Sequence, residues 1–444
     1  MTKYKLGIVS LGCDKNRVDS EIILGNLRDK FDLTNNPKEA DIIIVNTCGF
    51  IESSKQESIN TILEMAEYKN KYNCKVLIAT GCLTQRYSKD LQELMPEIDI
   101  MLGVNDYDKI LQTIEKFYDD HEKVVLCSEN TVVNEGERII TTGKNYAYVR
   151  ISEGCNNRCT YCAIPNIRGP YRSRTIESIL KEVKDIASQG VTEVIIIGQD
   201  TTMYGSDLYG EKKLSELINE ISKVNAIKWI RLLYCYPEEI TDELIEVIET
   251  NPKVCKYIDM PIQHISNNIL KLMGRRGTKE TIISVIDKLK ERVKDIALRT
   301  TFIVGFPGET EEDFNELLYF VKQTAFENMG VFQYSPEDGT AAARLNNMID
   351  DELKKEREEK VMLLQQQVSF NNNKNKIGKV YETLVENYDG EYFIGRTQYM
   401  APEIDGMIYI NPHKNIKIGE YVMVRVSEAG EYDLVGDVYY ESCK

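Results

Sequence analysis

Short apolar runs alternate with amphipathic stretches over the first third of the chain. Continuous apolar runs of this length are typical of strands buried in a parallel sheet, and the stretches between them repeat apolar positions with the period of a helix. We therefore predict a three-layer α/β domain, in which helices cover both faces of the sheet. The predicted strands are residues 6–10, 42–46 and 76–80, and the predicted helices are residues 20–27, 57–66 and 91–95.

A polar segment interrupts this pattern before a second series of strands and helices begins. Residues 123–143 are rich in Glu, Asn, Thr and Gly, which predicts a linker behind a first domain of residues 1–122. Residues 144–373 then repeat strand and helix, which predicts a partial (β/α)6 barrel with its chemistry at the carboxyl ends of the strands. The predicted strands are 146–152, 193–198, 228–233, 257–261, 297–305 and 330–334, and a charged helix over 351–368 closes the unit.

The pattern of apolar and polar residues changes again after the Asn-rich stretch around Asn371. Residues 374–444 alternate apolar and polar positions between Gly and Asn-Pro turns, which predicts a small antiparallel β-barrel. The fold class is therefore α/β with several domains. The predicted strands of the barrel are residues 379–387, 391–397, 406–410 and 420–426.

Composition and charge argue against a membrane-spanning protein and against a surface that binds nucleic acid. The chain has 444 residues, of which 42% are hydrophobic, and its apolar runs are far shorter than the roughly 20 residues that span a membrane. No targeting pattern precedes Lys5, so we expect a cytoplasmic protein without a membrane partner. The formal net charge of −16 argues against a surface that binds many phosphates, because such affinity comes mainly from Lys and Arg.

Three of the eleven cysteines form a local motif. Cys155, Cys159 and Cys162 are spaced CxxxCxxC in the loop after the first strand of the predicted barrel. Tetrahedral zinc and ordinary cubane clusters usually take four protein ligands. Three thiolates therefore either recruit a distant fourth ligand or leave one metal with an open position, and an open iron suits catalysis. A structural zinc site is the competing interpretation.

Residues 153–162, EGCNNRCTYC, closely resemble the signature of the radical S-adenosylmethionine (SAM) superfamily. The resemblance implies a 4Fe-4S cluster on the three cysteines, with an open iron that chelates the methionyl group of SAM. It implies one-electron cleavage of SAM to a 5′-deoxyadenosyl radical. It also implies that Tyr161 packs near the adenine.

Other segments at predicted strand ends resemble the same superfamily. Residues 301–309, TFIVGFPGE, are similar to the late-strand segment that flanks the cofactor, so Gly305 and Glu309 are candidate cofactor contacts. Gln199 and Gln263 end the second and fourth strands and are candidates to contact the ribose or the methionyl part. A capped turn or a hydrogen-bonded core position is the alternative interpretation of each, as it is of His264.

Three more cysteines, Cys13, Cys48 and Cys82, are spread over the first domain, one at the end of each apolar run. Adjacent parallel strands stand about 5 Å apart, so three strand ends on one edge of a sheet converge. We therefore predict a second metal site there, with three buried core cysteines as the alternative. The remaining cysteines match neither triplet, and we expect them to be structural: Cys74, Cys127, Cys235, Cys255 and Cys443.

The two triplets together resemble the methylthiotransferases, and the resemblance covers essentially the whole chain. These radical enzymes have an N-terminal domain with a second 4Fe-4S cluster, a central radical domain and a C-terminal barrel of the TRAM type. The resemblance implies two SAM molecules: one methylates sulfur held at the N-terminal cluster, and the other supplies the radical that removes hydrogen from the substrate carbon. It also implies an electron donor such as a flavodoxin or ferredoxin.

The sequence favours one branch of these enzymes. Residues 11–21, LGCDKNRVDSE, resemble the branch that modifies the β-carbon of an aspartate in ribosomal protein S-twelve of the small subunit, although Asp14 stands where we expect proline. Residues 198–205 and 333–340 resemble the same branch. Two alternatives stay open: the same chemistry on N6-modified adenosine in transfer RNA, and a non-catalytic iron-sulfur protein that binds ribosomes.

Charge in the C-terminal barrel also favours a protein substrate. From residue 376 to 444 the chain holds seven Lys or Arg against twelve Asp or Glu, hence a net charge of −5, which suits a basic ribosomal protein better than RNA. The alternative is that a cluster of cations, Lys376, Lys379 and Arg396, binds RNA phosphates. RNA binding is therefore open but not favoured. Five arginines are candidates to ring the barrel mouth and engage a carboxylate: Arg168, Arg172, Arg174, Arg275 and Arg276.

Overall fold

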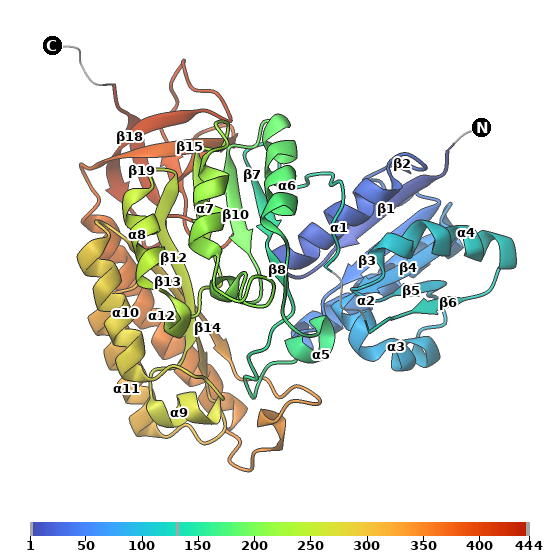
Figure 1. The fold of residues 1–444 in the computed structure, drawn as a ribbon, viewed down its shortest axis with the longest axis horizontal. Coiled ribbons are helices and arrows are strands. Elements are labelled where there is room, and N and C mark those ends of the chain that lie inside the picture. Colours follow the sequence, from blue (N-terminus) through green and yellow to red (C-terminus); the bar gives the residue numbers. More distant parts are fainter. Residues whose placement is uncertain (1–2, 130–132, 441–444) are drawn as a thin grey trace.

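The chain folds into three units that pack on one another. The computed structural model describes residues 3–129 and 133–440. Figure 1 shows an N-terminal α/β unit beside a central sheet, and a small β-barrel at one end of that sheet. The α/β multidomain fold expected from the sequence is confirmed by two six-stranded sheets and one closed barrel.

The N-terminal unit is built on a parallel sheet with the strand order β2-β1-β3-β4-β5-β6. Apolar residues of α1 and α4 form a core on one face, and those of α2 and α3 form a core on the other, which confirms the three layers. The strands are β1 (Lys5–Ser10), β2 (Asp32–Leu33), β3 (Ile42–Thr47), β4 (Val76–Gly81), β5 (Ile100–Leu102) and β6 (Val124–Leu126). The helices are α1 (Asp14–Leu27), α2 (Glu52–Lys71), α3 (Cys82–Leu94), the 3-10 turn η1 (Tyr107–Lys109) and α4 (Ile110–Asp120).

The three long strands of this unit match the apolar runs, whereas the short strands and the helix starts do not. The strand β6 lies inside the predicted linker and pairs with β5, so the sheet extends past residue 122. Three-residue strands carry too few positions to show a period. Helix α1 begins at Asp14 and α3 at Cys82, earlier than predicted, because their first turns bury polar residues such as Asn16 and Thr84 that an apolar pattern does not mark.

The central unit is an open parallel sheet with the strand order β14-β13-β12-β11-β10-β7. All six predicted strands and the predicted closing helix are present, and that helix continues through the Asn-rich stretch to Lys374. The strands are β7 (Tyr146–Arg150), β10 (Glu193–Ile197), β11 (Trp229–Leu232), β12 (Val254–Gln263), β13 (Ala297–Val304) and β14 (Asn328–Gln333), with a short pair β8 (Ser152–Glu153) and β9 (Arg172–Ser173).

Helices cover the outer face of the central sheet. Threonines cap four of them, since Thr175, Thr241, Thr278 and Thr310 each accept a hydrogen bond from a first-turn backbone N–H. The helices on this face are α6 (Ile176–Ser188), α7 (Leu214–Ser222), α8 (Asp242–Thr250), α10 (Lys279–Arg292), α11 (Glu311–Thr324) and α12 (Asp351–Lys374). Helix α5 (Ile164–Arg168) packs against α3 of the N-terminal unit, and α9 (Asn267–Leu272) lies at the end of the sheet. The 3-10 turns are η2 (Thr201–Met203), η3 (Pro237–Glu239) and η4 (Ala342–Arg344).

The C-terminal unit is a closed five-stranded barrel with the order β15-β16-β17-β19-β18. It corrects the prediction in two respects: β19 was missed, and β17 pairs with β19 in parallel, so the barrel is mixed and not purely antiparallel. Alternating polarity identifies a segment as a strand but does not reveal its neighbour or direction. The strands are β15 (Val380–Tyr388), β16 (Phe393–Thr397), β17 (Ile408–Ile410), β18 (Tyr421–Ala429) and β19 (Leu434–Val438).

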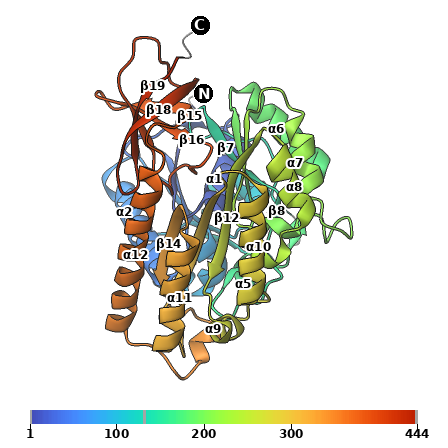
Figure 2. The same cartoon turned by 90° about the vertical axis from the view of Figure 1, so that its left-hand side faces the viewer.

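Buried ion pairs join the C-terminal barrel to the amino ends of the central strands. Glu193 at the start of β10 accepts hydrogen bonds from Arg231 and from Arg396 of the barrel, at 2.7 Å each. Tyr257 donates to Asp405 at 2.8 Å. Figure 2 shows the barrel and α9 at opposite ends of the central sheet. Across the described residues, we find no helix that is both long and apolar enough to cross a bilayer.

Candidate functional site

The ends of β1, β3 and β4 approach one another closely. They carry Cys13, Cys48 and Cys82, which we call the first triplet because they come first along the chain. A Cβ atom on Gly12 would lie 3.0 Å from the Cys48 sulfur, and one on Gly81 would lie 2.4 Å from the Thr47 carbonyl oxygen. Both glycines have positive φ angles, +84° and +97°, which other residues rarely adopt. The chain therefore needs glycine immediately before Cys13 and Cys82 to bring the strand ends together.

Asn16, which is fully buried, connects these three strand ends. Its Nδ2 donates to the carbonyl oxygens of Leu11 at 3.0 Å and Thr47 at 2.9 Å, which lie two and one residues before Cys13 and Cys48. Its Oδ1 accepts a contact from the Cys82 sulfur at 3.5 Å. One amide thus fixes the backbone or side chain beside each cysteine of the triplet, a role that the sequence analysis did not recognise.

The three thiols of the first triplet differ in exposure and interact electrostatically. Cys48 and Cys82 are buried, whereas Cys13 is accessible to solvent. Burial raises the pKa of the Cys82 thiol to about 12; nearby Arg168 opposes this rise, and Cys13 and Cys48 add to it. Cys82 therefore lies close enough to both Cys13 and Cys48 for their charges to interact.

The second triplet, Cys155, Cys159 and Cys162, lies in the loop that follows β7 and β8, at the carboxyl end of the central sheet. Two neighbouring segments clamp the middle of this loop: the Thr160 N–H donates to the Met273 carbonyl at 2.9 Å, and the Thr160 carbonyl accepts from the Ala342 N–H at 2.8 Å. A turn links Cys162 N–H to the Cys159 carbonyl at 3.1 Å. The loop is therefore held against α9 and η4.

Burial disfavours the thiolate form of two cysteines in the second triplet, Cys155 and Cys162. The pKa of Cys155 is raised to about 11 and that of Cys162 to about 12, mainly by burial and in part by the neighbouring cysteines. The Cys155 sulfur accepts a hydrogen bond from the Asn157 N–H at 3.4 Å. A bound metal cation reverses this balance, because it deprotonates a coordinating thiol. Backbone N–H donors of this kind suit a thiolate ligand.

The donor sets of both triplets fit iron-sulfur clusters. Thiolate ligands favour zinc, copper(I) and iron-sulfur centres. Within the described ranges, no three His, Cys, Asp or Glu side chains converge closely enough to hold a single metal ion. A cluster of several irons is wider than one ion, so its ligands stand farther apart. Three cysteines on each site leave one cluster iron without a protein ligand.

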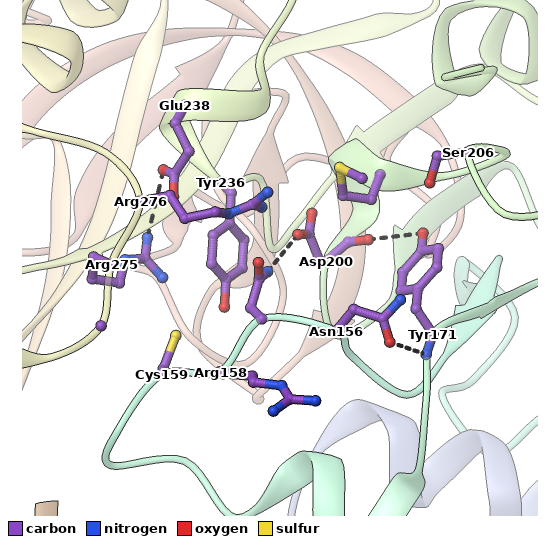
Figure 3. A pocket seen from close by; sticks show the side chains of 13 residues that line it. Asn156, Arg158, Cys159, Tyr171, Asp200, Ser206, Tyr236, Glu238, Arg275 and Arg276 are labelled. Atoms are coloured by element: carbon purple, nitrogen blue, oxygen red, sulfur yellow. Dashed lines mark hydrogen bonds and ion pairs between the residues drawn. The ribbon is translucent and has the colours of Figure 1, made fainter. Parts of the chain in front are cut away.

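A cavity of about 290 Å³ lies against Cys159, beside the second triplet (Figure 3). On one side, Asp200 accepts a hydrogen bond from Asn157 Nδ2 at 2.7 Å. On the other side, the Arg275 guanidinium lies over the Tyr236 ring, 4.2 Å from its centroid. Among the described residues, Arg275 Nη1 has no hydrogen-bond partner although it is buried. The cavity thus offers a carboxylate and an unsatisfied guanidinium N–H to a small polar ligand.

The candidate cofactor residues lie near this loop but not on the cavity wall. Tyr161 packs edge-on against Phe306, with 6.5 Å between ring centroids. Gln199 Nε2 donates to Glu153 at 2.6 Å, and its Oε1 is buried without a hydrogen-bond partner in the described chain. Gln263 has a φ angle of +72°, a conformation rare for any residue but glycine. Their contacts with SAM stay a prediction.

Gly305 and Glu309 contact other parts of the chain. A Cβ atom at Gly305 would lie 2.3 Å from Cγ of Lys354 on α12, so the close approach at this glycine is to a helix. Glu309 is buried; it accepts from the Phe306 N–H at 3.0 Å and pairs with Arg357 at 3.1 Å. Burial raises the pKa of Glu309 to about 7. His264 is likewise buried, and its Nδ1 accepts from the Ser266 N–H at 3.0 Å, as a core imidazole does.

The five candidate arginines do not form one ring. Arg275 and Arg276 line the cavity. Arg174 pairs with Glu182 at 2.5 Å, and Arg172 bonds backbone carbonyls. Arg168 points away from the cavity into the N-terminal unit, where it contacts Cys82 at 3.3 Å. Tyr236 was not predicted as a site residue, although it follows β11 at the same sheet edge as the predicted residues.

Comparison with known proteins identifies the family. Residues 5–103 match the uncharacterized protein family UPF0004, residues 149–321 the radical SAM superfamily and residues 377–438 the TRAM domain. The chain is 58% identical to the ribosomal protein uS12 methylthiotransferase RimO of Clostridium novyi (strain NT) and 59% identical to that of Clostridium botulinum (strain Langeland), each over 100% of both chains. The chain belongs to the RimO family of methylthiotransferases.

RimO membership confirms the branch recognised from residues 11–21 and the assignment as a radical SAM methylthiotransferase. The match to the radical SAM superfamily implies SAM and a 4Fe-4S cluster as cofactors. The fold is shared with the radical SAM methyltransferase TsrM of Kitasatospora setae, at a TM-score of 0.58 and 14% identity over 83% of this chain and 89% of TsrM. That likeness concerns the fold alone.

Proposed function

We propose that this chain transfers a methylthio group to the β-carbon of an aspartate in ribosomal protein uS12, the protein called S-twelve above, using two SAM molecules and two 4Fe-4S clusters. Family membership supports the reaction and the substrate. The observation that carries the proposal is the pair of cysteine triplets, each at the carboxyl edge of its own parallel sheet, joined by the five-residue helix α5.

Residues of the chain have separate roles in this reaction. Cys155, Cys159 and Cys162 would hold the cluster that, when bound with SAM, supplies one-electron cleavage of the sulfonium. Arg275 offers an N–H to a carboxylate at the cavity, and guanidinium matches that group geometrically. The first triplet would hold the other cluster, with its open position available for sulfur on the solvent-accessible side at Cys13.

The C-terminal barrel supports a protein substrate. Of the three cations that RNA binding would require there, Arg396 is buried in ion pairs with Glu193 and Glu386, and Lys376 donates to Asn373 at 2.9 Å. Lys379 alone of the three is exposed. An acidic barrel with one free cation in this group is a poor ligand for phosphates and attracts a basic protein.

A flavodoxin or ferredoxin would supply the electron in the cytoplasm. Exposed cations surround the loop of the second triplet: Arg158 within it, Lys271 on α9 and Arg344 on η4. In the described part of the chain, none of these three forms an ion pair, although the protein carries a net charge of −16. The three family matches fall within the proposed domains 1–122, 144–373 and 374–444, although β6 extends the first domain past residue 122.

The decisive experiment offers both substrates to the reconstituted protein without oxygen. We expect mass spectrometry to find a methylthio group on the uS12 aspartate and none on transfer RNA. Cys155→Ala should abolish formation of 5′-deoxyadenosine, Cys13→Ala should retain it but lose transfer, and the control Cys127→Ala should keep both. A methylthiolated nucleoside without modified uS12 would reject the substrate. Intact SAM under strong reductant would favour the non-catalytic alternative.

A further inference from the structure

The guanidinium of Arg168 lies between the two cysteine sites. Arg168 ends helix α5, six residues after Cys162, and only 2% of it is exposed. Its Nη2 donates to the Cys82 sulfur at 3.3 Å and to Asn16 Oδ1 at 2.7 Å. A residue from the loop of the second triplet therefore contacts a ligand candidate of the first triplet directly.

The remaining contacts of Arg168 fix its orientation. Its Nη1 donates to Asp19 at 2.8 Å and to Glu153 at 3.2 Å, and both carboxylates also pair with Arg150. Two arginines thus balance two buried carboxylates, and the contact with Cys82 is additional. Only a planar group with several N–H donors can reach four acceptors at once, so lysine could not replace this arginine.

Asn16 extends the influence of Arg168 to the whole first triplet. The amide that accepts from Arg168 donates to the carbonyls of Leu11 and Thr47, beside Cys13 and Cys48. If the guanidinium is removed, the Asn16 side chain loses the donor that holds its Oδ1, and the Cys82 sulfur loses its cationic neighbour. Each cysteine of the triplet is therefore tied to Arg168 through at most one intervening side chain.

We propose that Arg168 is a positioning residue of the first cysteine site: it orients the Cys82 thiolate and makes the cluster there easier to reduce. The inference rests on the proposed function, in which this triplet holds a cluster. Hydrogen bonds to ligand sulfurs are among the groups that set the reduction potential of an iron-sulfur cluster, and a cationic donor stabilises the more negative, reduced state.

The test uses the full chain with Cys155, Cys159 and Cys162 replaced by alanine, so that a cluster can assemble only on the first triplet. In this background we compare Arg168→Gln and Arg168→Lys with the control Arg174→Gln. Arg174 is buried and paired with Glu182, and no contact joins it to a cysteine in the described structure. The reduction potential is measured by electron paramagnetic resonance at controlled potentials, with iron content beside it.

Arg168→Gln should lower the ratio of reduced to oxidised cluster about tenfold at a fixed potential, a shift of about 59 mV for one electron. Arg168→Lys should give a smaller shift, and Arg174→Gln none. Loss of iron from both Arg168 variants, with the control retaining it, also supports the role. An unchanged potential, or equal changes in all three variants, would overturn it. If the parent itself assembles no cluster, the proposed function has failed and not this inference alone.

Discussion

Single residues decide how closely the strand ends of the first site approach. Gly12 combines a positive φ angle with the Cys48 side chain 2.8 Å from the position of its missing Cβ. The Cys48 amide is fixed in turn, because it donates to Ser58 Oγ at 2.9 Å. Cys48 cannot retreat from a methyl group at residue 12 without losing this bond.

Gly12→Ala should therefore lose the cluster at the first triplet, while the cluster at the second triplet is retained. The control is Gly190→Ala, because Gly190 has a φ angle of +99° but no atom within 4 Å of the missing Cβ. Both variants should lose about 1–2 kcal/mol of stability from backbone strain. Iron content should fall by about half in Gly12→Ala only. Equal iron content in both variants would show that the contact with Cys48 is unimportant.

At this scale the sequence predicted the cysteines but not the residues that support them. Local spacing identified Cys155, Cys159 and Cys162, and strand ends identified Cys13, Cys48 and Cys82, because both signals run along the chain. Asn16 and Arg168 act across units that are far apart in sequence. The periodicity of apolar positions along the chain does not show which side chain will contact another domain.

At the scale of elements, the start of α11 is held by polar side chains. Thr310 and Asp313 form a capping box, and Glu309 directly before it pairs with Arg357 of α12. Burial outweighs the attraction of Arg357 and leaves the pKa of Glu309 at about 7, above its ordinary value of 4.5. The folded chain therefore binds a proton at Glu309 over a pH range in which the unfolded chain has lost it.

The free energy of unfolding should consequently fall as the pH rises from about 4.5 to about 7, relative to Glu309→Gln, which has no such proton. The largest difference is about 3 kcal/mol, from roughly 1.4 kcal/mol per pKa unit. Urea midpoints of both proteins across this range test the prediction, with the exposed Glu311→Gln as the control. Parallel pH profiles of Glu309→Gln and the parent would contradict it.

Strands and helices with several apolar positions could be predicted from the sequence. The neighbour and the direction of each strand in the barrel could not. Strands β3 and β4 are buried along their full lengths, and each begins with a continuous apolar run, residues 42–45 and 76–79. The parallel pairing of β17 with β19 depends on how the barrel closes. Closure involves residues far apart in the chain, which a local pattern does not record.

For the whole molecule, the uneven charge distribution favours encounter with an acidic electron carrier. Removing Arg158, Lys271 and Arg344 together by glutamine substitution should slow reduction by flavodoxin roughly tenfold at low salt, because steering raises association rates by at least this factor. Reduction by dithionite should not change, since a small reductant needs no docking surface. The rate of 5′-deoxyadenosine formation is the measurement.

The matched control removes three exposed lysines elsewhere, Lys181 and Lys184 on α6 and Lys322 on α11. It changes the net charge equally but leaves the surroundings of the loop intact. A similar loss with flavodoxin in both triple variants would indicate a response to total charge alone. In that case the donor would not dock at the second triplet.

Helix α1 places recognition and chemistry side by side. Arg17 of this helix pairs with Glu403 of the C-terminal barrel at 3.0 Å, while Asp14, just after Cys13, accepts from Tyr234 of the central unit at 3.1 Å. Three residues of helix span only about 5 Å. Under the proposed function, a ribosomal protein that binds the barrel and displaces Glu403 would free the Arg17 side chain about one helical turn from Cys13. Substrate binding would then change the surroundings of the first triplet without any motion of whole domains.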